Sequence, residues 1–403
     1  MTLPFHTEQV GSLLRPAELV TARTAANPEP RFLEESLPEE VRHLTEQAVA
    51  QVVQQQLALS IRPITSGEYG RSIFYAGFFE KLKGFTVKEV PVPQGFRSNQ
   101  PTIRTLEKLG YPARTEAIAV GKIENKQSPY LGEWLQLRKH VPKELWKDCK
   151  FTMPPITWEH MHLSVGTAYT SSSGYRTERE YFQDLAAAYV KEFRTLYNAG
   201  VRSIQIDDPS LTFFVTDEFR SGCIADGEDP DALLDLYIWA HNQCLVGRPT
   251  DLHVGIHLCR GNMPQGRYMS TGSYERIAEL LFKKMEYDTF YLEYDTDRAG
   301  DFQPLRHLPV GKNVVLGLVS TKVADLERVE DLEARVYEAA DVIANGQGRS
   351  RSEVLATSLA VSPQCGFSSM SSGHGVGMTM ERMWEKLQLI QALVERIWGQ
   401  KSD

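Results

Sequence analysis

The stretch "REYFQDLAAAYVKEFRTLYNAGVRSIQID" (Arg179–Asp207) predicts a long amphipathic helix followed directly by a buried strand. Apolar side chains recur at helical spacing from Leu185 to Leu196, and the Asn-Ala-Gly sequence ending at Gly200 is a typical helix stop signal. The short apolar run that follows ends in Asp207. A helix that leads straight into a buried strand is typical of a parallel sheet with its helices outside.

The same helix-then-strand pattern recurs along the chain. It appears in "PEEVRHLTEQAVAQVVQQQLAL" before "IRPITSGE", in "ERIAELLFKKM" before "DTFYLEYD", and in "DLEARVYEAADVIANG" before "VLATSLAVSP". Eight segments qualify as strands: EQVGS, RPITS, KFTMPP, SIQID, HVGIHLC, FYLEY, VVLGLVS and LAVSPQC. The pattern predicts an α/β fold, a TIM (β/α)8 barrel, as a single catalytic domain over residues 1–403.

Two further regions complete the predicted architecture. Residues from about 77 to 126 form an inserted β-hairpin region, because "FTVKEVPVP" and "TEAIAVGKI" favour an antiparallel pair. An amphipathic stretch from about 378 to 399 predicts a C-terminal closing helix. An open doubly wound sheet is the alternative, but no glycine-rich phosphate loop follows an early strand.

Composition narrows the class of protein. A formal net charge of −8 argues against a nucleic-acid binder or a protein of anionic membrane surfaces. There is no apolar run of about 18 residues, and "MTLPFHTEQVGSLLRP" lacks the features of a signal peptide. The five cysteines are widely spaced, unlike a disulfide framework. We therefore expect a soluble, cytoplasmic protein.

Reactive groups of a TIM barrel stand at the C-terminal ends of its strands. Those ends carry Ser12, Glu68, Asp207, His257, Cys259, Glu293 and Cys365. In "GIHLCRGN", His257 and Cys259 are two residues apart, so both side chains face the same side of a strand. Two thiols, an imidazole and a carboxylate are the ligand types that zinc favours. Each residue alone also has a structural explanation, as a core residue or a helix cap.

Three of these segments carry a family resemblance. "GIHLC", "YLEYD" and "VSPQCG" resemble blocks of the cobalamin-independent methionine synthases, in their catalytic C-terminal barrel. The resemblance implies a barrel of the uroporphyrinogen decarboxylase and methionine synthase type. It also implies a Zn2+ site made by His257, Cys259, Glu293 and Cys365.

Other blocks extend the resemblance toward a substrate site. "IQIDDPSL" resembles the block whose aspartate holds the substrate amino group, which implies that role for Asp207. "QVGSLLRP" resembles the opening block and implies substrate contacts at Val10 and Ser12. "TSGEYGR" implies that Glu68 is the second carboxylate on the amino group. The implied activity is a zinc-dependent methyltransferase that methylates a thiol, most simply homocysteine to methionine, without bound cobalamin.

The chain also departs from this family. It has one barrel where full-length members have two, and "CRGN" and "GLVSTK" resemble the short single-barrel relatives. Lys322 lies where the family has a histidine, and could act as a general acid, pair with an anion on the donor, or be solvated. Trp158 is the nearest candidate for the family's pterin-stacking tryptophan. The methyl donor, methyl-folate or methylcobalamin, stays open.

Three alternatives remain at this stage. One is a zinc-dependent alkyl-thiol transferase or lyase that acts on a different thiol in a specialised pathway. Another is a metal-free enzyme like uroporphyrinogen decarboxylase, in which His257, Cys259 and Cys365 would be core residues. The third is a zinc-stabilised scaffold without enzymatic activity.

Several neighbouring residues have two possible roles. His253 could orient a metal ligand or be structural, and Arg71 could anchor a substrate carboxylate or only form a salt bridge. His160 and His162 follow the third strand and could line the site. Gly366 is expected to permit a tight turn after Cys365. Asp208 stands where the family has a glutamate, and a shorter carboxylate there could alter the donor side.

Overall fold

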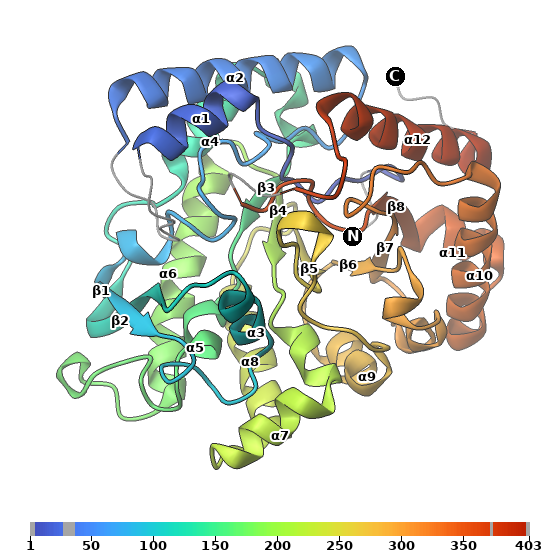
Figure 1. The fold of residues 1–403 in the computed structure, drawn as a ribbon. Helices are drawn as coiled ribbons and strands as arrows, with labels where there is room; N and C mark the ends of the chain where they lie inside the picture. The colour runs from blue at the N-terminus through green and yellow to red at the C-terminus, as the bar shows by residue number, and fades with distance from the viewer. Residues whose placement is uncertain (1–4, 27–36, 371–373, 400–403) are drawn as a thin grey trace.

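Six parallel strands stand side by side in the middle of the molecule, in chain order (Figure 1). The computed structural model describes residues 5–26, 37–370 and 374–399. Residues 1–4, which begin the stretch that lacks signal-peptide features, lie outside these ranges. Every residue of the six strands is buried, as expected for a parallel sheet covered on both faces. The strands are β3 (Phe151–Met153), β4 (Ser203–Asp207), β5 (His253–Leu258), β6 (Thr289–Glu293), β7 (Asn313–Val319) and β8 (Leu359–Pro363).

Two N-terminal segments, residues 8–12 and 62–66, close these strands into a barrel. The Glu8 N–H donates a hydrogen bond of 2.8 Å to a carbonyl of β8. Ile64 forms a parallel bridge with Cys149, just before β3, and the two segments meet at a parallel bridge between Ser12 and Gly67. The fold is therefore the TIM (β/α)8 barrel that the sequence predicts.

The first two barrel segments differ from the prediction in one respect. Residues 8–12 and 62–66 were expected to be strands, but each forms only isolated bridges. Gly11 and Gly67 have φ angles of 138° and 66°, which regular extended backbone does not allow. Pro63 has no N–H to donate to a neighbouring strand. The local backbone therefore prevents a continuous ladder.

Helices surround the strands (Figure 1). The predicted helices are confirmed to within about two residues at each end, the usual uncertainty of a helix boundary. No helix in the described ranges is both long and apolar enough to cross a membrane. The helices outside the insertion are α1 (Ala17–Ala26), α2 (Glu39–Ala58), α4 (Leu131–Lys139), α5 (Trp158–His162), α6 (Glu178–Asn198), α7 (Asp217–Ala225), α8 (Pro230–Cys244), α9 (Glu275–Lys284), α10 (Val329–Gln347), α11 (Arg351–Ser358) and α12 (Met380–Trp398).

The segment before β8 contains a helix that the sequence did not predict. The predicted strand LAVSPQC does begin at Leu359, but the residues before it in "VLATSLAVSP" belong to α11. Ser350 and Glu353 form a capping box at the start of this helix. Such a box satisfies two backbone N–H groups that the first helical turn would otherwise leave without partners.

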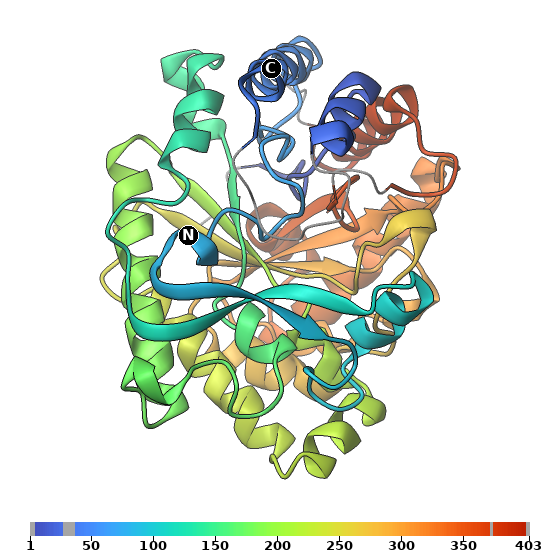
Figure 2. The same ribbon diagram turned by 60° about the vertical axis from the view of Figure 1, so that its left-hand side comes forward.

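The predicted insertion region contains an antiparallel pair, β1 (Lys83–Pro91) and β2 (Ala113–Glu124), with α3 (Pro101–Lys108) between the strands. Figure 2 shows this pair as a long ribbon separate from the central sheet. β2 contacts the barrel through a bridge between Ala119 and Tyr169. The insertion matters for function because α3 and β2 contribute side chains to the cavity described next.

A buried ion pair lies inside the barrel. Lys150 Nζ is 2.8 Å from Glu8 Oε2, and the Tyr291 hydroxyl donates to the other oxygen of Glu8 at 3.3 Å. Lys150 also lies over the Tyr291 ring, 4.4 Å from its centroid. A charged pair in a barrel interior is stable only because each charge has a partner.

Candidate metal and substrate site

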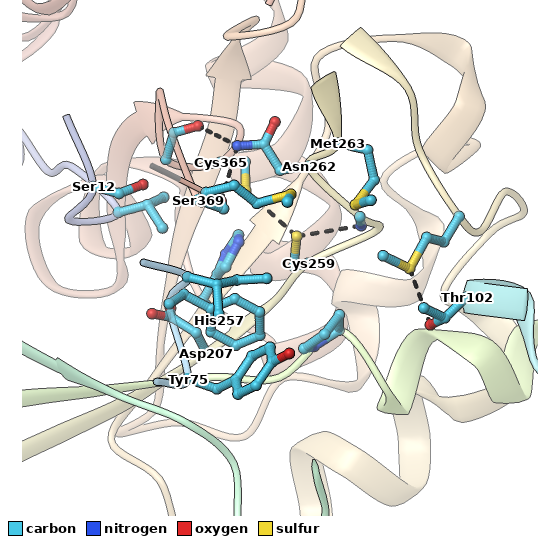
Figure 3. Close-up of a pocket in the computed structure, with 18 of the residues that line it drawn as sticks. Ser12, Tyr75, Thr102, Asp207, His257, Cys259, Asn262, Met263, Cys365 and Ser369 are labelled. Atoms are coloured by element: carbon cyan, nitrogen blue, oxygen red, sulfur yellow. Dashed lines mark hydrogen bonds between the residues drawn. The ribbon is translucent and has the colours of Figure 1, made fainter. Parts of the chain in front are cut away.

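A cavity opens at the C-terminal ends of the barrel strands (Figure 3). Asp207 reaches it from the end of β4, His257 from β5, and Cys259 from the residue after β5. Cys365 reaches it from the loop after β8, and Ser12 from the N-terminal segment. Residues far apart in the sequence therefore meet in one space.

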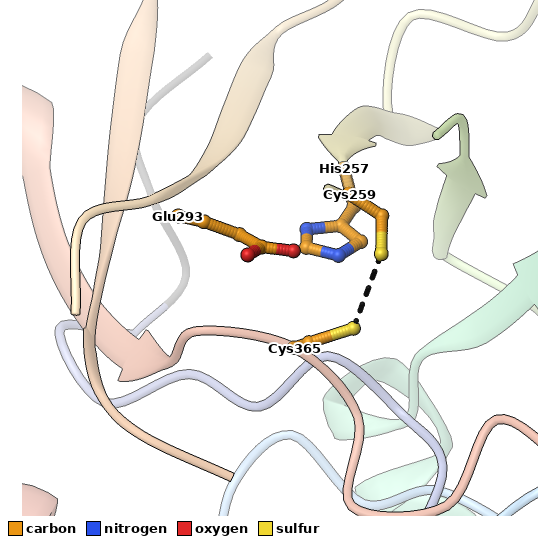
Figure 4. A group of neighbouring side chains, drawn as sticks. All are labelled: His257, Cys259, Glu293 and Cys365. Carbon is orange, nitrogen blue, oxygen red and sulfur yellow. Dashed lines mark hydrogen bonds between the residues drawn. The ribbon is translucent and has the colours of Figure 1, made fainter. Parts of the chain in front are cut away.

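Four side chains at this cavity form a candidate metal site (Figure 4). Each of His257, Cys259, Glu293 and Cys365 offers one ligand atom, and these atoms all lie within 4.8 Å of one another. All four residues are buried. The two cysteines are free thiols with their sulfur atoms 3.4 Å apart. The structure thus brings together the four residues that the sequence suggested.

The electrostatics of the cluster suit a cation. A hydrogen bond from the Cys259 thiol holds the pKa of Cys365 well below its usual range, with His257 contributing and burial opposing. Burial opposes protonation of His257, but Cys365, Asp207 and Glu293 outweigh it and raise its pKa. Burial and the adjacent Cys365 raise the pKa of Glu293. The lowered pKa favours negative charge on the Cys365 sulfur, whereas Glu293 would gain its charge from a cation bound beside it.

The imidazole of His257 supports a metal more directly. Both of its ring nitrogens are buried, and neither has a hydrogen-bond partner among the residues that the structure describes. A buried nitrogen without a partner costs free energy unless a ligand satisfies it. Nitrogen, sulfur and carboxylate oxygen converge here, and this donor set is typical of zinc sites. The four residues could therefore hold a metal ion.

Glu293 is oriented by two neighbours. The backbone N–H of Arg260 donates to its Oε1 at 2.7 Å, and Arg298 Nη2 donates to its Oε2 at 3.2 Å. Arg298 is itself paired with Asp295 at 2.7 Å. Such contacts fix the direction of a ligating carboxylate.

His253 does not support the metal ligands. Its ring nitrogens contact Ser203 Oγ at 3.3 Å and Thr289 Oγ1 at 2.8 Å, at the start of β5. His257 lies near the opposite end of the same strand. The role of ligand orientation suggested for His253 is therefore wrong, because the two side chains are separated along the strand.

Two carboxylates face the same cavity. Glu68 accepts a hydrogen bond of 2.6 Å from Thr152 on Oε1, while its buried Oε2 has no hydrogen-bond partner within residues 5–26, 37–370 and 374–399. Asp207 accepts from Gln205 Nε2 at 2.6 Å. Burial raises the pKa of Asp207 to about 7, against the lowering effect of His257. Val10 and Ser12 also line this part of the cavity.

Arg71 is held away from a substrate by its own contacts. Its Nε donates to Glu133 at 3.0 Å and its Nη2 to the Thr152 carbonyl at 2.8 Å. Its guanidinium also packs over the Tyr130 ring, 4.3 Å from the centroid. Of the two roles considered for Arg71, the structure favours the salt bridge.

Lys322 is not one of the residues that line the cavity. Its ammonium donates to the carbonyl of Gly261 at 2.7 Å and contacts that of Arg267 at 3.5 Å. The side chain is buried against the loop that follows β5. Its predicted role as a general acid stays a prediction, and its contacts point to a different role that is developed below.

The far side of the cavity is apolar and aromatic. Trp158 lines it, with its ring centroid 4.5 Å from that of Tyr75 and 5.0 Å from that of Phe74. Its indole N–H has no hydrogen-bond partner in the described part of the chain. The sequence did not single out the other residues here, because they come from loops and the insertion. They include Phe74, Tyr75, Leu106, Arg114, Met263, Met269 and Met370.

His160, His162 and Asp208 do not line the cavity. His160 contacts Tyr237 and Glu178, and His162 contacts the Trp158 carbonyl. Asp208 is paired with His241 at 2.9 Å. It therefore stabilises the turn after β4 and does not face the part of the cavity where a methyl donor would bind.

The glycine after Cys365 has a different role from the expected one. Gly366 does not have a positive φ angle, so backbone freedom is not what the position requires. A Cβ atom there would lie 1.9 Å from Ser12 Oγ. The missing side chain allows the loop after β8 to approach the N-terminal segment.

Comparisons with known proteins agree with this geometry. A sequence model of the cobalamin-independent synthase catalytic domain matches residues 166–383. The chain belongs to this family. The range matched by the cobalamin-independent synthase model includes all four candidate metal ligands and Asp207, whereas Val10, Ser12 and Glu68 precede it. The alternative like uroporphyrinogen decarboxylase treated His257, Cys259 and Cys365 as core residues, whereas all three line the cavity.

The relatives that match this chain differ in their sequence identity to it and in the share of the chain that the match covers. The uncharacterized protein YxjH of Bacillus subtilis is 29% identical over 398 residues, covering 98% of this chain and 95% of its own. A solved structure of the putative vitamin-B12 independent methionine synthase from Listeria monocytogenes has a TM-score of 0.70 and 25% identity. That match covers 99% of this chain and 100% of the other. The methionine synthase of Pyrococcus abyssi is 26% identical over 225 residues, or 56% of this chain and 54% of its own.

Proposed function

We propose that this protein is a zinc-dependent methyltransferase that transfers a methyl group to the thiol of homocysteine and so forms methionine. One observation carries the proposal: three residues of the metal cluster, His257, Cys259 and Cys365, line the same cavity as the carboxylates Glu68 and Asp207. A thiol group and an ammonium group of one small amino acid could reach both at once. The name of the Pyrococcus relative points to the same product.

The two carboxylates would bind the substrate ammonium group. Glu68 Oε2 is buried and no described residue donates a hydrogen bond to it, so an ammonium N–H would supply the partner. Asp207 has a raised pKa of about 7 because it is buried, and a cation beside it would favour its ionised form. Ser12 and Val10 lie at the same end of the cavity and would contact the rest of the amino acid.

The metal cluster would hold the reacting sulfur. Zinc bound by His257, Cys259, Glu293 and Cys365 would keep a substrate thiol deprotonated at neutral pH, where a free thiol with a pKa near 8.5 is mostly protonated. The thiolate then attacks the methyl carbon of the donor. A sulfur–carbon bond forms, and the bond from the methyl group to the donor breaks, with its electron pair leaving on the donor.

The donor would occupy the aromatic side of the cavity. Trp158, Phe74 and Tyr75 form a wall there, and flat rings favour stacking with an aromatic donor. Methyl-folate and methylcobalamin are both candidate donors. The predicted cytoplasmic location is part of the same proposal.

The proposal is tested by a methyl-transfer assay on metal-loaded protein, with a donor and an acceptor varied separately. The donors are methyl-folate, its polyglutamate form and methylcobalamin. The acceptors are homocysteine and 4-mercaptobutyrate, which has no amino group. We expect transfer to homocysteine with at least one donor, and activity lost on zinc removal and restored by zinc.

Asp207→Asn sharpens this experiment. The change removes a charge-assisted hydrogen bond worth about 1.5–3 kcal/mol, which corresponds to about 10–100-fold weaker homocysteine binding. Binding of 4-mercaptobutyrate should be unaffected. Full activity of metal-free protein, or equal use of both thiols by the unaltered protein, would contradict the proposal. Transfer to another thiol alone would favour the alkyl-thiol alternative.

A further inference from the structure

Three loops at the C-terminal ends of the strands are tied together by two side chains. Lys322, in the loop after β7, donates to the carbonyl of Gly261 in the loop after β5 at 2.7 Å. Asn262, beside Gly261, donates to the carbonyl of Gly366 in the loop after β8 at 2.7 Å. Its amide also donates to Ser369 Oγ at 3.0 Å. The loops after β7 and β8 are thus both hydrogen-bonded to one short segment, residues 260–262.

This short segment lies directly beside the cluster. Cys259 precedes it, and the Gly261 N–H points to Cys259 Sγ at 3.3 Å. The Arg260 N–H donates to Glu293 at 2.7 Å. On the other loop, Gly366 follows Cys365 in the chain. The shortest contact of each residue, Lys322 to the Gly261 carbonyl and Asn262 to the Gly366 carbonyl, therefore acts on backbone within two residues of a cysteine of the cluster.

The segment has little freedom of its own. Gly261 has a φ angle of 96°, and a Cβ atom there would lie 2.8 Å from the Met269 backbone nitrogen. Glycine adopts this backbone without strain, and the absence of a side chain lets Met269 approach closely. The Lys322 ammonium adds a hydrogen bond that holds the Gly261 carbonyl in place.

We propose that Lys322 and Asn262 are positioning residues: they fasten the loop of Cys259 to the loops after β7 and β8, so that Cys259 and Cys365 face each other across the metal site. Neither residue provides a ligand atom of the cluster. Loss of either contact would let the two cysteines separate. The inference rests on the proposed metal site but not on the reaction assigned to it.

The competing role for Lys322 is proton donation to the departing methyl donor. Two backbone carbonyls already accept from its ammonium, and carbonyl oxygens cannot relay a proton onward. The side chain is also not part of the cavity lining. A group that delivers a proton must come within hydrogen-bond reach of the atom that receives it.

The test compares Lys322→Met and Asn262→Ala with the unaltered protein, using metal affinity as the first readout. Affinity for Zn2+ and Co2+ is measured by competition with a chelator, without substrate. We expect each change to weaken metal binding about 10–100-fold, as is usual when a residue that supports metal ligands is lost. With Co2+ we expect a weaker thiolate-to-metal absorption band. Lys322→Arg, which keeps the charge and the N–H donors, should recover part of the affinity.

Lys312→Met is the matched control. Lys312 precedes the opposite end of β7, and its ammonium donates to the carbonyl of Tyr287, far from the cluster. Its loss should leave metal affinity unchanged. The control therefore shows whether weaker metal binding in Lys322→Met comes from the contacts that Lys322 makes or from the loss of any partly buried lysine.

Two results would overturn the inference. In the first, Lys322→Met binds metal as tightly as the unaltered protein, but its rate of methyl transfer at saturating metal is almost lost. That result is expected if Lys322 is a proton donor. In the second, Lys322→Met and Asn262→Ala both leave metal affinity and the cobalt spectrum unchanged. If Lys322→Met fails to fold, Asn262→Ala still decides, because it breaks the contact to the loop after β8 without removing a charge. Weakened metal binding in a protein without methyl transfer would support the inference and contradict the proposed function.

Discussion

The sulfur atoms of Cys259 and Cys365 lie 3.4 Å apart, although 106 residues separate them in the chain. One sulfur stands after β5 and the other after β8, and the parallel strands of the barrel carry both to the same end. A hydrogen bond from Cys259 keeps the pKa of Cys365 well below that of an ordinary thiol. This pair, with His257 and Glu293, is the chemical centre of the molecule.

Cys365→Ser should remove the metal. Purified protein is expected to hold about one zinc ion per chain, the stoichiometry of a single four-ligand site. The hydroxyl of serine is a poor zinc ligand, so affinity should fall by more than the about 10–100-fold expected for a supporting residue. Metal content and chelator competition check this. Cys244→Ser, a buried cysteine in α8, is the control and should keep its zinc.

Gly366→Ala should weaken substrate binding. The new Cβ would lie 1.9 Å from Ser12 Oγ, so the serine side chain must turn away from its place in the cavity. Loss of one hydrogen bond worth about 0.5–1.5 kcal/mol corresponds to roughly 2–10-fold weaker homocysteine binding. Calorimetric titration measures the affinity. Gly132→Ala is the control, because no atom lies within 4 Å of the added Cβ, and it should leave homocysteine affinity unchanged. Equal homocysteine affinities in the two variants would contradict the assignment of Ser12 as a substrate contact.

Glu159→Gln should alter how stability depends on pH. Glu159 is fully buried and accepts from the Ala117 N–H at 2.9 Å. Burial, and then the adjacent Glu116, raise its pKa well above that of an ordinary carboxyl group. A raised folded pKa means that stability is greatest below the unfolded value, about 4.3, and falls as pH rises toward the folded value.

Glutamine is neutral at every pH and can still accept from Ala117. The variant should therefore gain stability relative to the unaltered protein between pH 5 and pH 8, at about 1.4 kcal/mol per unit of pKa shift. Urea unfolding at several pH values measures this. Glu107→Gln, at an exposed position of α3, is the control. A stability difference that does not change with pH would refute the prediction.

Lys150→Met should destabilise the barrel. The change leaves the Glu8 carboxylate buried without its ion-pair partner, which costs about 3–5 kcal/mol in comparable cases. Equilibrium unfolding in urea measures the loss. Adding Glu8→Leu should restore part of the stability, because an apolar pair in the interior has no charge to satisfy. A double variant as unstable as the sum of the two single variants would show that the two residues do not interact.

Local sequence patterns were enough to predict most of the fold. Helical periodicity and β-branched runs located the long helices and six of the eight barrel segments, because both depend on residues close together in the chain. The two remaining segments, 8–12 and 62–66, were predicted as strands and form only bridges. The start of α11 was missed because a capping box outweighed the β propensity of the residues after it.

The sequence by itself determined which residue types stand at the strand ends, and so the candidate ligands His257, Cys259, Glu293 and Cys365. Alternation along a strand placed His257 and Cys259 on one side, since residues two apart share a face. Only the tertiary structure decided that these ligands converge within 4.8 Å, that Lys322 contacts backbone carbonyls rather than the cavity, and that Phe74, Tyr75 and α3 form the far wall. The reason is physical: those contacts join loops and strands distant in the chain, and their geometry depends on how the barrel closes.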